Sequence, residues 1–436
     1  MTVIETPARV DPRPSSTRSR DTGIDLLRAV SVIAVVVLHA LMVGVTVTPS
    51  GPVFENAADS GWWIVPVSWV LQVMPLFFII GGFAGAIALR RQREAGGTAS
   101  AFVADRLHRL LRPAGFTIAA VGAGLALLSM AGVPAGIVAV AGFRFGQPLW
   151  FLGVFLLCQA LLPALLRLHE QAPLRTLGLL VGAAVSVDAI RLLSGLDAIG
   201  FLNLAFVWLT LQQIGFLLAD GRIDRVGVRT RIGIAAACAG LLLVSFLTGV
   251  HSPDLIANLN PPTNALLLVG GIQIMLVSLL RERIAAWSRR PRVRMLSDFV
   301  NRRTMTIYLW HMPVLLGMAG LCVVLGLVGV VDLPHPGEPL WWTSRPLWVA
   351  GALAVTAVVA VPLSRVEAAP APADIGSPRR IALGTMLGIS AVVMLLVAGT
   401  SVLTAASAVL AMFVARRLAQ ASALRSEPSA LRAQAK

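Results

Sequence analysis

The stretch IDLLRAVSVIAVVVLHALMVGVTV, residues 24–47, decides how this chain must fold. It is long and apolar enough to cross the hydrocarbon core of a bilayer, which takes about 20 helical residues. It nevertheless contains Asp25, Arg28 and His39. Ionisable side chains at membrane depth are costly, so they point to a functional site by default.

Arg28 and His39 are eleven residues apart, which is about three turns of an α-helix. They therefore lie on one face, about 16 Å apart along the helix axis. This face carries a cation near one membrane surface and an imidazole near the membrane centre. A simpler explanation is an arginine that extends to the surface and a histidine that bonds a backbone carbonyl. The shared face weakens that explanation and keeps a functional role open.

The rest of the chain is also strongly apolar. Of its 436 residues, 57% are hydrophobic and only 13% are charged. A water-soluble protein of this length has too little interior to bury so much apolar surface, so we expect a multi-pass membrane protein. The three cysteines show no paired or metal-ligand spacing. Neither a disulfide nor a bound metal is therefore expected.

The arginines predict the topology. Candidate spans lie at about 24–47, 64–89, 114–134, 147–166, 174–194, 199–219, 232–250, 263–280, 304–330 and 345–364. With the N-terminus in the cytoplasm, the inner connections 90–112, 167–175, 220–231, 281–303 and 365–380 contain 23 arginines. The outer connections contain only Arg144. The positive-inside rule fixes this orientation, and it accounts for the net charge of +15 without a nucleic acid.

The last apolar run, residues 381–414, is too long for one crossing and barely long enough for two. One crossing would leave the basic segment 415–436 outside, whereas two would return it to the cytoplasm, as the charge rule prefers. We expect one crossing, with the excess along the membrane interface. The fold class is then all-α polytopic, with about 10–12 transmembrane helices and about eleven as the best estimate.

The predicted organisation is one membrane domain, residues 23–414, between two tails. Residues 1–22 are rich in Pro, Ser, Thr and Arg and form a disordered basic tail. Residues 415–436 form a second basic tail.

Arg106 and Arg109 form a stripe before Pro113 at the cytoplasmic surface. They are three residues apart, so their guanidinium groups lie on one side of a helix. Such a stripe suits a phosphorylated ligand, because arginine binds phosphate through paired hydrogen bonds. Positive-inside flanking alone explains several of these arginines equally well.

Together, five stretches in this order resemble the membrane-bound acyltransferase 3 family. They are Arg28 with His39, FFIIGGF at 77–83, Arg106 with Arg109, QPLWFL at 147–152 and IYLWHMP at 307–313. The resemblance covers about residues 20–365. Gly81 stands where many members have serine, and the C-terminal tail is too short for the extracytoplasmic hydrolase-like domain of some members.

The resemblance implies transfer of an acyl group, usually acetyl, from cytoplasmic acyl-CoA to a hydroxyl of a glycan, a glycolipid or a small molecule. It implies that His39 is the catalytic histidine with Arg28 as its motif partner. Arg106 and Arg109 match the pair that engages the CoA side. The expected location is the plasma (inner) membrane.

Four further side chains are predicted to contact the substrates. They are His311, Tyr308, Trp150 and Gln147. The alternative function is a transporter or flippase without covalent chemistry, because polar groups at the midplane of ten or more spans also suit transport. The sequence has no evident inverted repeat, and the arginine pair lies at the surface, which favours the transferase.

Overall fold

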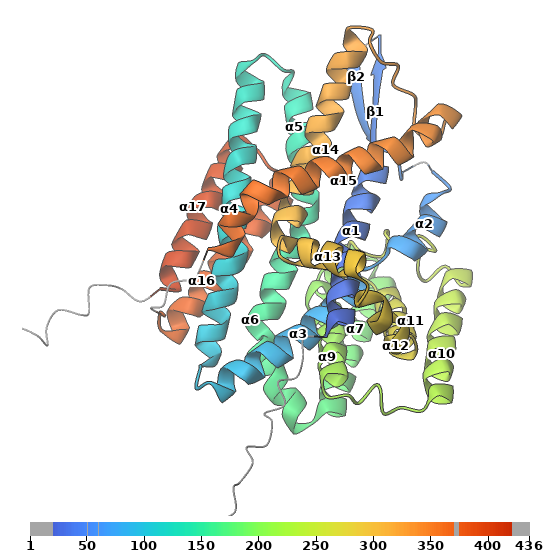
Figure 1. Ribbon diagram of the computed structural model, residues 1–436, viewed down its shortest axis with the longest axis vertical. Helices are drawn as coiled ribbons and strands as arrows, with labels where there is room; N and C mark the ends of the chain where they lie inside the picture. The colour runs from blue at the N-terminus through green and yellow to red at the C-terminus, as the bar shows by residue number, and fades with distance from the viewer. Residues whose placement is uncertain (1–20, 50, 60, 370–374, 421–436) are drawn as a thin grey trace, which may run out of the picture.

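The computed structural model describes residues 21–49, 51–59, 61–369 and 375–420 (Figure 1). Most of the predicted tails, 1–20 and 421–436, lie outside these residues. Within the described part, ten helices are long and apolar enough to cross a membrane, or eleven if one bent pair counts as a span. The prediction of an all-α multi-pass membrane protein is therefore confirmed.

The first half of the chain contains most of the site-bearing elements. It comprises α1 (Thr22–Met42), β1 (Val43–Thr48), β2 (Gly51–Asn56), α2 (Ile64–Leu71), α3 (Met74–Glu94), α4 (Ala99–Met130), α5 (Ala135–Gly146), the 3-10 helix η1 (Gln147–Leu149) and α6 (Trp150–Gln171). The long α4 and the continuous path of α5, η1 and α6 form an antiparallel pair (Figure 1).

The second half completes the bundle and returns to α1. It comprises α7 (Pro173–Ser194), α8 (Asp197–Gly200), α9 (Asn203–Ala219), α10 (Val228–Leu247), α11 (Ala265–Leu279), α12 (Arg281–Ser288), α13 (Pro291–Asn301), α14 (Thr304–Leu327), α15 (Pro339–Ala368), α16 (Pro378–Val397) and α17 (Val402–Leu418). Helix α15 crosses the bundle obliquely in front of α1 and α14 (Figure 1).

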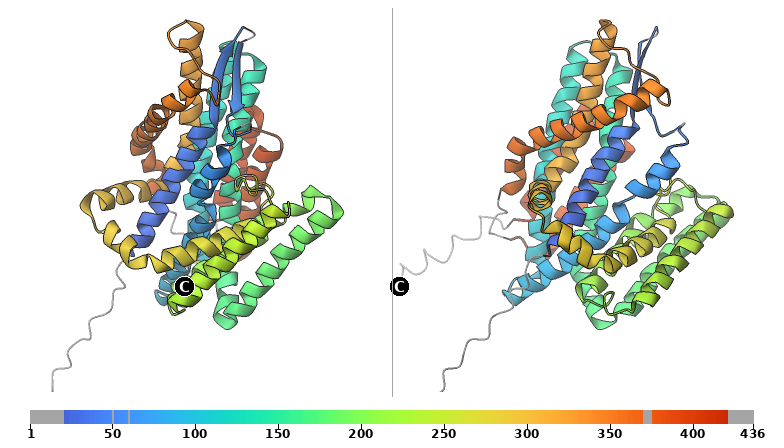
Figure 2. Two further views of the ribbon diagram at one scale, coloured as in Figure 1. Left: turned by 90° about the vertical axis from the view of Figure 1, so that its right-hand side faces the viewer. Right: turned by 45° about the vertical axis from the view of Figure 1, so that its right-hand side comes forward.

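The first span ends earlier than predicted. Helix α1 stops at Met42, and Val43–Thr48 pairs antiparallel with Gly51–Asn56. The segment VGVTVT is rich in β-branched residues, which favour strands. Gly51 has a φ of 119°, which suits glycine at the reversal. The resulting hairpin projects beside the end of α14 (Figure 2).

The last apolar run contributes one candidate span, Pro378–Val397, as predicted, but the excess expected along the membrane interface folds back on that span. The run forms a helical hairpin in which α16 and α17 lie side by side (Figure 1). Gly399, with a φ of 74°, supplies the left-handed turn. Ser401 then caps α17 by accepting a hydrogen bond from the backbone N–H of Thr404. Because the turn is so short, two helices fit where the sequence suggested one, and Arg416 returns to the arginine-rich end.

Other boundaries also differ from the prediction. Residues 135–146, expected as an outer connection, form α5, and the chain reverses at 131–134 instead. Gly132 has a φ of 80° there, and Pro134 precedes the first residue of α5. The inner connection 281–303 contains α12 and α13, and α11 and α12 meet at a bend of 70°.

The centre of the bundle forms where α3, α6 and α9 meet. A Cβ atom on Gly82 would lie 2.2 Å from the carbonyl oxygen of Gln212, and one on Gly215 would lie 2.1 Å from that of Ile79. Glycine therefore permits backbone contact between α3 and α9. Beside it, Phe78 stacks on Trp208 with ring centroids 4.4 Å apart.

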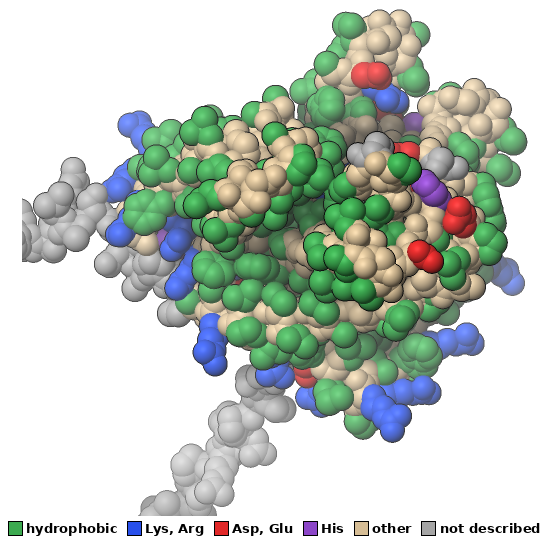
Figure 3. All heavy atoms as spheres, turned by 90° about the horizontal axis from the view of Figure 1, so that it is seen from above, with side chains coloured by type: hydrophobic (Ala, Val, Ile, Leu, Met, Phe, Trp, Pro, Cys, Tyr) green, Lys and Arg blue, Asp and Glu red, His purple; other side chains and the backbone are tan. Residues whose placement is uncertain are grey.

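The end of the bundle that carries the β-hairpin has a different surface from the arginine-rich end. Seen from that end, acidic and histidine side chains gather at one side (Figure 3). Glu55 of β2 and His335, which precedes α15, lie 4.0 Å apart there. Trp63 and Trp341 are buried beneath this surface with ring centroids 6.0 Å apart, so they pack the start of α2 against the start of α15.

Candidate active site

A cavity of about 980 Å³ lies inside the bundle. Its wall brings together residues that lie far apart in the sequence, from α1 to α16. One end is lined by Arg28, Arg106 and Arg109, which lie close enough to interact electrostatically. His39 lines the same cavity three turns further along α1. The predicted cation and imidazole therefore face a shared, protein-lined space.

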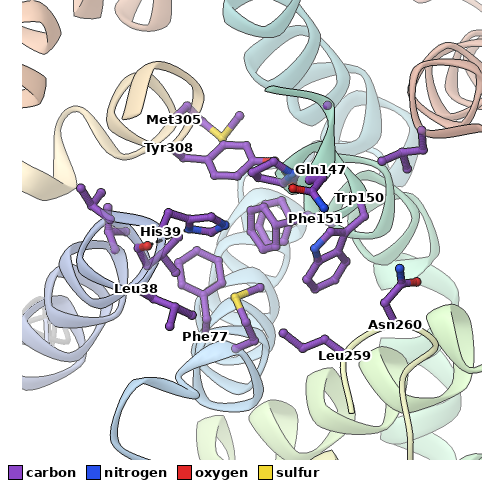
Figure 4. Close-up of a pocket in the computed structure, with 18 of the residues that line it drawn as sticks. Leu38, His39, Phe77, Gln147, Trp150, Phe151, Leu259, Asn260, Met305 and Tyr308 are labelled. Atoms are coloured by element: carbon purple, nitrogen blue, oxygen red, sulfur yellow. Dashed lines mark hydrogen bonds between the residues drawn. The ribbon is translucent and has the colours of Figure 1, made fainter. Parts of the chain in front are cut away.

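His39 is held in an orientation that suits a base. Its Nδ1 lies 2.8 Å from the carbonyl oxygen of Val35. Because a carbonyl only accepts hydrogen bonds, the neutral ring carries its proton on Nδ1 and its lone pair on Nε2. Figure 4 shows the ring in the cavity between Phe77 and Tyr308. The backbone carbonyl therefore satisfies one ring nitrogen and leaves the other for chemistry.

His311 lies behind His39. The two ring centroids are 4.9 Å apart, and the ring planes are inclined by 60°. His311 is 0% exposed, and its Nδ1 lies 2.5 Å from the carbonyl oxygen of Tyr308. Its Nε2 has no hydrogen-bond partner among the described residues. The structure places His311 against the catalytic candidate, whereas the sequence suggested direct contact with substrate.

The guanidinium group of Arg28 is fixed at the other end of this face. Its Nε donates to Asn301 Oδ1 at 2.7 Å, and one terminal nitrogen pairs with Asp25 at 3.2 Å. Asn301 in turn donates to the carbonyl oxygen of Asp25 at 2.8 Å. These bonds hold the cation at the cavity wall, because they restrict its long side chain.

Arg106 and Arg109 differ in burial and in their hydrogen-bond partners. The guanidinium group of Arg106 lies over the ring of Phe102, 4.9 Å from its centroid. Its Nε is buried and has no hydrogen-bond partner among the described residues. Arg109 is more exposed and donates from Nε to Asp105 at 2.9 Å. Arg106 therefore keeps a donor for a bound anion, and Arg109 stands at the entrance.

The remaining predicted contacts form the aromatic and amide part of the wall. Tyr308, Trp150 and Gln147 all line the cavity. The Tyr308 hydroxyl donates to the carbonyl oxygen of Pro148 at 2.8 Å, so its ring rather than its hydroxyl faces a ligand. Trp150 stacks on Trp208, with ring centroids 5.5 Å apart, which fixes the indole plane.

Glu367 and Asn260 also line the cavity, although neither belongs to the predicted site. Glu367, at the end of α15, accepts hydrogen bonds from the backbone N–H groups of Met305 and Thr306 at 3.2 and 3.0 Å. A carboxylate at the N-terminus of α14 is favoured by the helix dipole. Asn260 reaches the opposite part of the wall from the connection before α11. Both residues are far in sequence from His39 and the arginines. They reach the cavity wall only because the helices pack together.

A cluster of charged and polar side chains around Asp220 lies outside this cavity. Asp220, which follows α9, accepts from His169 Nε2 at 2.9 Å and from Arg90 at 2.8 Å. Burial alone would raise the pKa of Asp220, but these hydrogen bonds outweigh that effect and lower it. The cluster connects the ends of α3, α6 and α9 and therefore serves the packing of the bundle.

Comparison with known proteins agrees with this arrangement. A family model for an acyltransferase domain, acyltransferase 3, matches residues 21–365. The match spans α1 to most of α15 and includes the three arginines and the two histidines of the site. Neither a curated protein nor a solved structure matches the chain. The chain belongs to the acyltransferase 3 family and is a multi-pass membrane acyltransferase.

Proposed function

We propose that the protein transfers an acyl group, as acetyl, from acyl-CoA to an acceptor hydroxyl at the plasma membrane. The observation that carries this proposal is one cavity that joins three guanidinium groups to the imidazole of His39. The donor binds from the cytoplasmic end, where the positive-inside rule locates the arginines. The acceptor is a glycan, a glycolipid or a small molecule.

The arginine end suits the phosphates of CoA. Arg28 is held by Asn301 and Asp25, whereas Arg106 has an unused buried donor. Arginine binds phosphate oxygens through paired, charge-assisted hydrogen bonds, which fits both side chains. About 16 Å of helix separates Arg28 from His39, and the slender arm of CoA can cover that distance with its thioester at the imidazole.

His39 acts as the general base in this proposal. Its Nε2 takes the proton of the acceptor hydroxyl while the hydroxyl oxygen attacks the thioester carbonyl. A carbon–oxygen bond forms, the carbon–sulfur bond breaks, and the proton passes from His39 to the departing thiolate. An acyl-histidine intermediate is the alternative route. Trapping that species with acyl-CoA alone would identify the alternative.

The test is acetyl-CoA cleavage by the purified protein in lipid nanodiscs. We expect His39→Ala to lower turnover at least about 100-fold, the usual scale of a lost general base. His335→Ala is the matched control, because His335 is 62% exposed and pairs only loosely with Glu55, at 4.0 Å. Equal turnover in wild type and His39→Ala would overturn the proposal and favour a transporter.

A further inference from the structure

Away from the arginines, the cavity wall includes exposed apolar residues, which indicates a second opening there. Its lining there includes Phe143 on α5, Phe201 before α9 and Val397 at the end of α16. These side chains are 54%, 47% and 83% exposed. Both α5 and α16 belong to candidate membrane spans. Exposed apolar faces of such helices lie against hydrocarbon, so this opening faces lipid rather than water.

Polar and aromatic groups lie just inside this apolar rim. Trp150 stands between Gln147 and Asn260 (Figure 4). Arg144, the one arginine of the predicted outer connections, donates to Gln147 Oε1 at 3.4 Å, which leaves the amide NH₂ of Gln147 as a donor. A fixed indole face flanked by two amides suits the ring and hydroxyls of a sugar or polyol.

The wall that carries Asn260 is held in place by long-range bonds. Gln72 donates to the carbonyl oxygen of Leu255 at 2.8 Å, and the backbone N–H of Asn264 donates to Asp188 at 2.7 Å. The segment between these bonds is therefore fixed to α2 and α7. Because this wall is already ordered, the opening keeps a defined shape. Less conformational entropy is then lost when a ligand of matching shape binds.

We infer that the acceptor is an amphiphile: a hydroxyl-bearing, sugar-like headgroup on a hydrocarbon chain that enters sideways from the bilayer. The headgroup lies on Trp150 and the two amides, and the chain extends past Phe143 and Val397 into lipid. A fully water-soluble glycan would meet an apolar rim that offers it no hydrogen bonds. This inference rests on the proposed acyl transfer, since it assigns the acceptor class for the same cavity.

The test uses an alkyl glucoside whose photoreactive diazirine lies on the first carbons of the chain, next to the sugar, added to the protein in nanodiscs. After illumination, peptide mass spectrometry locates the adducts. We expect adducts on the half-buried lining residues Trp150, Leu204 and Leu259, and excess unmodified alkyl glucoside removes them whereas free glucose does not. Adducts confined to outward-facing positions such as Leu179 would overturn the inference, and so would equal competition by glucose.

A pair of variants checks the route. Val397→Trp narrows the opening, and we expect it to reduce the internal adducts about tenfold. Leu403→Trp is the matched control, because Leu403 is 76% exposed on α17 and does not line the cavity. Internal adducts that Val397→Trp leaves unchanged would overturn the side entrance.

The two experiments test the amphiphilic acceptor and the transferase activity independently. Cleavage of acetyl-CoA that depends on His39, without internal adducts, would overturn the amphiphilic acceptor and leave the transferase. Internal adducts without any cleavage would overturn the transferase and leave an entrance for amphiphiles.

Discussion

The imidazole rings of His39 and His311 lie 4.9 Å apart, inclined by 60°, inside the membrane bundle. Each ring places Nδ1 against a carbonyl oxygen of its own helix, Val35 for His39 and Tyr308 for His311. The two rings therefore share one protonation pattern but differ in access, since only His39 lines the cavity. His311 fills the space behind the catalytic candidate and limits its rotation.

This contact predicts a positioning role for His311. We expect His311→Ala, which removes the ring behind His39, to lower kcat about tenfold because His39 can then rotate out of place. His311→Phe, which keeps a planar ring of similar size, should retain most of the activity. The KM for acetyl-CoA should stay unchanged, since His311 is remote from the arginines. Steady-state kinetics in nanodiscs measure both constants. An unchanged kcat for His311→Ala, or a changed KM alone, would contradict the role.

The hydrogen bond from Arg28 to Asn301 predicts that donor binding depends on the orientation of the Arg28 guanidinium group. A lysine at position 28 keeps the charge but cannot match the planar fork of arginine. We therefore expect Arg28→Lys to raise the KM for acetyl-CoA about tenfold, the effect of about 1.4 kcal/mol of lost binding. Asn301→Ala should act in the same direction, because it releases the guanidinium group from its place at the wall.

The control for these variants is Arg294→Lys. Arg294 lies on α13, as Asn301 does, but its side chain is 70% exposed. It does not line the cavity, so its replacement should leave KM unchanged. Equal effects of Arg28→Lys and Arg294→Lys would show that only the general surface charge attracts the donor.

Local patterns predicted the part of the site that lies on one helix. The eleven-residue spacing of Arg28 and His39 fixed their shared face, and helical geometry needs no tertiary information. Asn301 is 273 residues from Arg28, and Glu367 is 61 residues from Thr306. Such partners meet only after the helices pack, so no local pattern could identify them.

The same distinction explains the errors in the fold. Hydropathy detects apolar length, and it therefore found nearly every span. It could not separate β1 from α1, because both segments are apolar and continuous. For the last apolar run, the sequence placed the turn that two helices would need around Gly399 and Thr400, but apolar length did not decide between one helix and two.

The contact between α3 and α9 predicts a cost for Gly82→Ala. The added Cβ would lie 2.2 Å from the Gln212 carbonyl oxygen, which is backbone and cannot move aside cheaply. We expect a loss of about 1–3 kcal/mol of stability, seen as a lower midpoint of thermal aggregation in detergent. Gly317→Ala is the control, because a Cβ on Gly317 would have nothing within 4 Å. A midpoint for Gly82→Ala that equals that of the control would contradict backbone contact.

The cluster around Asp220 predicts how stability depends on pH. Hydrogen bonds from His169 and Arg90 lower the pKa of Asp220 in the folded protein. The carboxylate therefore contributes stability above its ordinary pKa of about 3.9, and this contribution is lost as the pH falls through the lower folded value. Asp220→Asn should reduce stability by about 1–2 kcal/mol at pH 7. The difference from wild type should shrink once the pH falls below about 4. Thermal midpoints of both proteins across pH 3–8 measure this, and a difference that stayed constant with pH would show that Asp220 acts through packing rather than charge.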